Sequence, residues 1–143
     1  MLIDITIPGK PVAKGRPRFG VVHGKARAWT PRTTQAWEKM ASGVCVAVYQ
    51  GRPIDAPVSV SVTAVHPRPK NQMRKKDHRG RLWRAKKPDV DNEAKAALDA
   101  LVKGGILKDD ALVVELVARS MVAAIGEEAH VRIVITTVDG HPM

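Results

Sequence analysis

Alternation of apolar and polar residues along the chain predicts several β-strands. Residues 2–7 alternate in this way, and residues 58–64 place valine or alanine at every second position, with serine or threonine between them. Such a pattern is typical of a strand that is buried on one face only. Two further apolar runs, 112–123 and 131–138, predict two more strands joined near Gly126. A hairpin is also predicted, in which the two short strands of residues 19–22 and 26–30 pair across a His-Gly turn.

Residues 31–49 repeat apolar side chains at the helical spacing and predict the first long helix. Pro31 would stand at its first position, because proline lacks an N–H that the first turn leaves unpaired in any case. Thr30 would be the N-cap, since its hydroxyl can accept a bond from the first turn. The inner face of this helix is predicted to carry Trp37, Met40, Val44 and Val48.

A second helix is predicted over residues 92–103, a run rich in alanine and leucine, which are strong helix formers. Asp91 or Asn92 would be its N-cap. The pair Gly104-Gly105 would end it, because glycine readily adopts the left-handed conformation that closes many helices. Its buried face is predicted to carry Ala94, Ala97, Leu98 and Leu101.

These elements predict an α+β fold, with a mostly antiparallel mixed sheet of four or more strands and two main helices. A chain of 143 residues with 44% hydrophobic residues suits one domain over residues 1–143. Cys45 is the single cysteine, so an intrachain disulfide is excluded. Neither a secretory leader nor a run of about 18 apolar residues is found, so we expect a cytoplasmic protein without a membrane segment.

Charge is distributed unevenly along the chain. The net charge is +10, and nine of these charges come from residues 67–88, where ten Lys or Arg residues accompany one acid. Residues 10–37 hold seven more Lys or Arg and no acid. Such segments are either solvated surface or contacts for nucleic-acid phosphates. The residues predicted to contact phosphates are Lys14, Arg16 and Arg18 in the first segment and Arg74, Lys75, Lys76 and Arg79 in the basic loop 67–88.

Directly after the basic loop, a cluster of carboxylates begins. Pro88 favours an extended backbone around Asp89, and in an extended segment Asp89 and Asp91 would point to the same side. Lys95 follows Asp91 by four residues, so the two side chains would share a helix face. The helix and its glycines are followed by Asp109 and Asp110, and which of these two faces the first pair is left open by the sequence.

Grouped carboxylates suggest a bound cation. Two of them about 4 Å apart repel by roughly 4 kcal/mol at an effective dielectric constant near 20. Oxygen ligands without histidine or cysteine nearby favour Mg²⁺, with Mn²⁺ as the alternative. The structural alternative is a helix cap at Asp89 or Asp91, a surface ion pair between Asp91 and Lys95, and an acidic turn at Asp109 and Asp110.

The chain contains three sequence motifs that, in their order along the chain, resemble those of the RusA-type Holliday junction resolvases. The resemblance covers essentially the whole chain. One is D-x-D-N-x-x-K, here Asp89 to Asn92 followed by Lys95. Another is L-x-D-D-A at residues 107–111, after the second helix. The remaining one is K-G-R-P-R at residues 14–18, which is similar to the opening of phage and prophage members of that family.

The resemblance implies a Mg²⁺-dependent endonuclease that acts as a homodimer on four-way DNA junctions in a bacterial or phage-infected cell. By position, Asp89, Asp91 and Asp110 would be its catalytic carboxylates and metal ligands, and Lys95 its essential lysine. Two alternatives remain open. One is a DNA-binding protein without catalysis, whose carboxylates are structural. The other is a metal-dependent nuclease that acts on flaps or on RNA.

Overall fold

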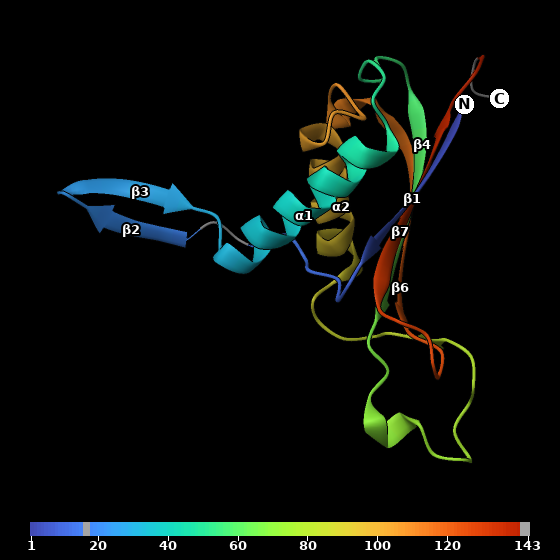
Figure 1. Cartoon of the computed structure of the whole chain (residues 1–143). Helices are drawn as coiled ribbons and strands as arrows, with labels where there is room; N and C mark the ends of the chain where they lie inside the picture. The colour runs from blue at the N-terminus through green and yellow to red at the C-terminus, as the bar shows by residue number, and fades with distance from the viewer. Residues whose placement is uncertain (16–17, 141–143) are drawn as a thin grey trace.

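The structure is a computed structural model that describes residues 1–15 and 18–140. It confirms the predicted α+β fold, with a five-stranded sheet, a separate two-stranded hairpin and two long helices (Figure 1). In chain order the elements are β1 Leu2–Pro8, β2 Arg18–Val22, β3 Lys25–Trp29, α1 Arg32–Val48, β4 Val58–His66, the 3-10 turn η1 Lys70–Gln72, β5 Leu82–Trp83, α2 Val90–Lys103, the 3-10 turn η2 Asp110–Leu112, β6 Val113–Val122 and β7 His130–Thr137.

The large sheet has the strand order β1-β7-β4-β6-β5. Only β4 and β6 run parallel, and the other neighbours are antiparallel, which confirms the mostly antiparallel mixed sheet. Strands β6 and β7 follow one another in the chain but do not pair, because β4 lies between them. A parallel pair needs a long crossover connection. Here the crossover from β4 to β6 contains the basic loop and α2.

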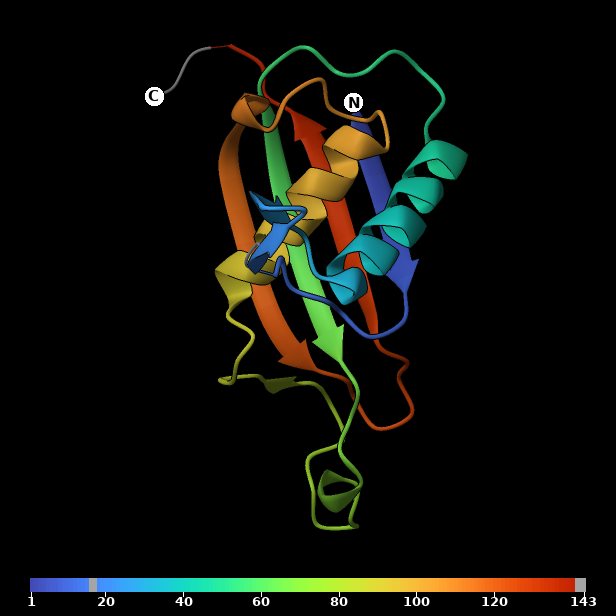
Figure 2. The same cartoon turned by 90° about the vertical axis from the view of Figure 1, so that its left-hand side faces the viewer.

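Both helices cover one face of the sheet, and the core lies between them and the strands (Figure 2). The alternating residues of β1, β4 and β7 supply the floor of this core, and for β1 and β4 the sequence pattern predicted this alternation. The helices approach closely where α2 ends, because a Cβ on Gly104 would lie 2.4 Å from the Cβ of Cys45. Gly105 has φ +78° and takes the left-handed conformation that ends α2.

The structure corrects the prediction for α1. The helix begins at Arg32, its N-cap is Pro31, and no side chain caps it, so Thr30 does not have the predicted role. Its buried residues are Thr34, Trp37, Glu38, Ala41 and Cys45, whereas Met40 and Val48 of the predicted inner face are exposed. Thr34 Oγ1 accepts a hydrogen bond from the backbone N–H of Gly15 at 3.1 Å. The amino-terminal segment therefore covers polar residues that an apolar pattern assigns to the surface.

The predicted hairpin is confirmed, and it projects away from the domain beside the start of α1 (Figure 1). Among the strands of the described residues, β2 and β3 pair only with each other. Within residues 1–15 and 18–140, no helix is both long enough and apolar enough to cross a membrane.

Candidate active site

The first two predicted carboxylates lie at the start of α2. Asp89 is the N-cap, with an extended backbone at ψ 151°, and its carbonyl accepts from the N–H of Glu93 at 3.2 Å. Its carboxylate makes no capping bond, and both Asp89 and Asp91 are exposed. Asp91 already belongs to the helix, so the prediction that both residues share an extended segment is wrong. The two carboxylates share the first turn of α2, where the helix dipole favours negative charge.

Lys95 lies one turn further along α2, on the same helix face as Asp91. Its side chain is exposed. Among the ion pairs of the described residues, none joins Lys95 to Asp91. The structural alternative of a surface ion pair is therefore not formed here, and the ammonium group stays open to a ligand.

A buried polar network holds the start of α2 against the sheet. His66, at the end of β4, places Nε2 2.7 Å from Oε2 of Glu93, and both side chains are at most 5% exposed. Ser120 of β6 donates to the other oxygen of Glu93 at 3.0 Å. Because the groups come from two strands and a helix, the network fixes where the first turn of α2 lies.

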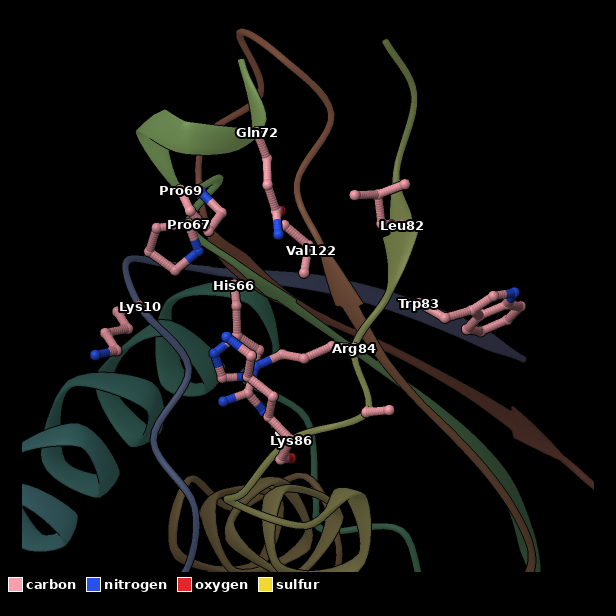
Figure 3. A pocket seen from close by; sticks show the side chains of 11 residues that line it. Lys10, His66, Pro67, Pro69, Gln72, Leu82, Trp83, Arg84, Lys86 and Val122 are labelled. Carbon is pink, nitrogen blue, oxygen red and sulfur yellow. Dashed lines mark hydrogen bonds between the residues drawn. The ribbon is translucent and has the colours of Figure 1, made fainter. Parts of the chain in front are cut away.

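Arg84 extends this network to the residues just before Asp89. Its guanidinium donates to the carbonyls of Lys87 at 2.7 Å and Pro88 at 3.2 Å, and it lies 3.7 Å from the carboxylate of Glu93. Arg84 and His66 approach each other over α2 at one side of a cavity of about 310 Å³ (Figure 3). Arg84 therefore links the end of the basic loop to the buried carboxylate of Glu93, which belongs to α2.

The sequence did not predict this network, and no role was inferred from it for His66 or Glu93. One signal was available, since position 93 falls on the apolar face of α2 together with Ala97 and Ala100. A carboxylate on a buried face needs a partner, because an unpaired buried charge is costly. The identity of the partner could not be read from the sequence.

The two candidates for the third carboxylate lie at the turn η2, where Asp109 is the N-cap and Asp110 the first residue. Asp109 accepts a hydrogen bond from the N–H of Ala111 at 2.9 Å, and this bond, followed by one with Asp110, lowers the pKa of Asp109. The hydrogen bond with Asp109 raises the pKa of Asp110, and the nearby charge of Asp99 adds to the effect. Asp109 thus caps the turn, and both carboxylates are exposed.

Asp110 does not lie beside Asp89 and Asp91. Together with Asp99 and Lys103 it lines a cavity of about 530 Å³ at the carboxyl-terminal half of α2. At 1.5 Å of rise per residue, positions 91 and 99–103 are separated by roughly 12–18 Å along the helix. Accordingly, residues 1–15 and 18–140 contain no group of three histidine, cysteine, aspartate or glutamate side chains that could hold a metal ion.

Lys14 lines the same cavity, but its ammonium group is engaged. It donates to Glu38 at 2.8 Å, which raises the pKa of Lys14, and it lies 3.1 Å from Asp99. Burial alone would raise the pKa of Glu38, but hydrogen bonds from Lys103 and Lys14 hold it below its ordinary value. Lys14 thus joins the two helices, and its contact with phosphate stays a prediction. Arg18 begins β2, and Arg16 lies outside the described residues.

The basic loop 67–88 is built around one buried arginine. Arg68 is 7% exposed and donates to the carbonyls of Gln72, His78 and Gly80. Of the four loop residues predicted to bind phosphate, Arg74 pairs with Asp77 at 3.1 Å. The side chains of Lys75, Lys76 and Arg79 are exposed at the surface.

Comparison with known proteins identifies the family of this chain. The sequence model of the endodeoxyribonuclease RusA family matches residues 8–136, so the chain belongs to that family. One relative, the uncharacterized protein YqaN of Bacillus subtilis (strain 168), is 38% identical over 122 residues, which are 80% of this chain and 83% of the relative. The resemblance inferred from the three sequence motifs is thereby confirmed.

Proposed function

We propose that this chain is an endonuclease that cleaves phosphodiester bonds in branched DNA, with the four-way junction as substrate and Mg²⁺ as cofactor. The observation that supports this proposal is the placement of Asp89, Asp91 and Lys95 on the first two turns of α2. All three side chains are exposed there, in a family of endodeoxyribonucleases. Three groups of this kind at one helix end suit a phosphodiester with its associated cation.

The cation does not fit three carboxylates of a single chain, because Asp110 lies at the other end of α2. If all three carboxylates hold one ion, a second copy must supply one of the ligands. We therefore include a homodimer in the proposal, in which Asp89 and Asp91 of one copy meet Asp110 of the other. When bound, Mg²⁺ would supply Lewis-acid activation at a phosphate oxygen and accept oxygen ligands, as hard cations do.

The residues of the chain have separate tasks in this proposal. Lys95 would neutralise charge that develops on the phosphate in the transition state. Asn92, exposed beside Asp91, would donate a hydrogen bond rather than bind the metal. Lys75, Lys76 and Arg79 of the basic loop would hold the phosphate backbone, and such contacts carry no sequence information.

The test is cleavage of an end-labelled four-way junction, with a flap and a branched RNA of the same arm sequences in parallel. Each reaction is run with Mg²⁺, with Mn²⁺ and with a chelator, and Asp91→Asn is the matched control for contaminating nuclease. We expect the wild-type chain to cut the DNA junction only with the divalent ion. Binding without cleavage under all conditions would show a DNA-binding protein instead. Faster cleavage of the flap or of the RNA would reassign the substrate.

A further inference from the structure

The hairpin β2–β3 has two chemically different faces. In an antiparallel pair, opposed residues lie on the same face, and Gly20 opposes Arg27 while Val22 opposes Lys25. The ring of Trp29 lies on this face too, since a Cβ on Gly20 would meet the ring at 2.7 Å. One face is therefore basic and carries a flat aromatic ring. The opposite face is apolar, and its residues are Phe19, Val21, Ala26 and Ala28.

The basic face borders a cleft between the hairpin and the start of α1. The cleft has a volume of about 560 Å³, and Val22 and Trp29 of the hairpin and Arg32 of α1 line it. Lys25, Arg27 and Arg32 are all exposed. None of them pairs with a carboxylate of the described residues. Between Asp4 and Glu38 the sequence contains no acid, and Arg32 is the charged residue among those that line the cleft.

The shape of the hairpin also suits a nucleic acid. Its two strands lie about 4.8 Å apart, and five residues of strand span roughly 17 Å. The major groove of B-DNA is about 12 Å wide and admits a two-stranded ribbon of this kind. An isolated hairpin is only marginally stable in water, so a partner that orders it is expected.

From these observations we propose that the β2–β3 hairpin is an arm that binds a DNA duplex through its basic face. Lys25, Arg27 and Arg32 contact the phosphates, and Trp29 supports the ribbon from the same side. The arm extends away from α2, so it reaches DNA at a distance from the candidate active site (Figure 1). The proposal rests on the proposed function for the identity of the substrate, and it adds a second contact region to it.

The experiment measures binding of a labelled four-way junction by fluorescence anisotropy, without divalent ions, between about 50 and 200 mM salt. The variant is Lys25→Gln with Arg27→Gln and Arg32→Gln. The matched control is Lys39→Gln with Arg52→Gln and Arg119→Gln, three exposed cations outside the hairpin and the cleft. Each lost phosphate contact lowers the slope of log affinity against log salt by about 0.9. We expect the slope to fall by up to about 2.7 in the variant, and its affinity to fall about tenfold or more at the middle of the range.

A second measurement does not depend on lost affinity. A photo-crosslinking amino acid at position 27 should give a covalent adduct with the junction, and the same group at position 39 should not. If the wild-type chain binds the junction but the variant keeps its slope and no adduct forms, the arm proposal is wrong and the proposed function stands. If the wild-type chain does not bind the junction, both proposals fail.

The apolar face provides the competing explanation. Phe19 is 80% exposed and Val21 is 75% exposed, so a protein surface could cover them. The molecular mass of the double variant Phe19→Ser with Val21→Ser is therefore compared with that of the wild-type chain by light scattering. If its mass falls while the variant without the three cations binds DNA normally, the hairpin binds a second copy of the chain. The proposal that the hairpin binds DNA is then wrong. If its mass is unchanged and the cation variant loses affinity, the arm binds DNA as proposed.

Discussion

At the amino-terminal end of α2, Asp89 and Asp91 lie next to a buried network of His66, Glu93 and Arg84. At the other end, Asp110 lies on a short surface turn that Asp109 caps. Both ends carry exposed carboxylates, but only the first is tied to the basic loop, through Arg84. The second lies where η2 leads into β6, beside the ion pairs that Lys14 and Lys103 make with Glu38. The difference indicates that each end has a support of its own, and that only the support of the first end continues into the basic loop.

Removal of the carboxylates should have the largest effect. Asp89→Asn, Asp91→Asn and Asp110→Asn should each abolish cleavage of the four-way junction, while binding stays equal or becomes tighter because negative charge near DNA is lost. The control is Asp4→Asn, since Asp4 is exposed on β1 and pairs with Arg132 away from α2. Cleavage by any one variant at the wild-type rate would remove that residue from the site.

Mixing two inactive variants should restore activity if the ends meet between copies. In a heterodimer of Asp91→Asn and Asp110→Asn, one site keeps all its carboxylates and the other loses two. With random exchange, half of the dimers are heterodimers, and each of these has one intact site of two. About a quarter of all sites in the mixture are therefore intact. Cleavage is measured after the two proteins are unfolded and refolded together. A mixture that stays inactive, although its mass shows dimers, would place the carboxylates of each site within one chain.

Loss of the lysine should be smaller than loss of a carboxylate. Lys95→Ala should slow cleavage by roughly two orders of magnitude, the scale for one electrostatic stabiliser of a transition state. Its stability should change by less than about 1 kcal/mol, because the side chain is exposed and unpaired with Asp91. Single-turnover cleavage is compared with that of Lys39→Ala, an exposed lysine of α1. An unchanged rate would show that Lys95 is only surface.

Removing the residue that supports each end of α2 should lower the free energy of unfolding of the protein by different amounts. Glu93→Ala leaves His66 and Arg84 without their buried partner and should lower the free energy of unfolding by roughly 3 kcal/mol. Asp109→Ala removes a cap at the surface and should cost about 1 kcal/mol. Urea unfolding followed by circular dichroism measures both. Equal losses would mean that the first end is no more strongly built than the second.

The smallest expected effect is a change in the pKa of Asp110 when Asp109 is removed. Without divalent ions, Asp110 should keep its proton to a higher pH than an ordinary aspartate, with a pKa above 3.8, because its largest perturbation is the hydrogen bond with Asp109. In Asp109→Ala that bond is lost, so the pKa of Asp110 should fall toward 3.8. Carboxyl carbon NMR follows both residues. A pKa of Asp110 that does not move would show that the two side chains do not interact.

Local sequence determined much of the fold. Strand β1, the hairpin and the end of α2 at Gly104-Gly105 were predicted correctly, because alternation, turn residues and glycine act over a few neighbouring positions. The mostly antiparallel mixed sheet was also predicted. Among the candidate site residues, the grouping of Asp89, Asp91 and Lys95 near one helix start followed from their spacing in the chain. The structure corrected the local backbone of Asp91, and it moved the N-cap of α2 from the predicted Asp91 or Asn92 to Asp89.

The tertiary structure decided whatever depends on contacts between distant segments. The inner face of α1 carries Thr34 and Glu38 because Gly15, Lys14 and Lys103 bind them, and no periodicity within the helix contains those partners. The His66–Glu93 pair and the parallel pairing of β4 with β6 arise in the same way. The distance between Asp110 and Asp91 follows from the length of α2 and from the packing of η2 against its last turns. Spacing in a sequence measures the path along the chain, and only packing turns that path into a position in space.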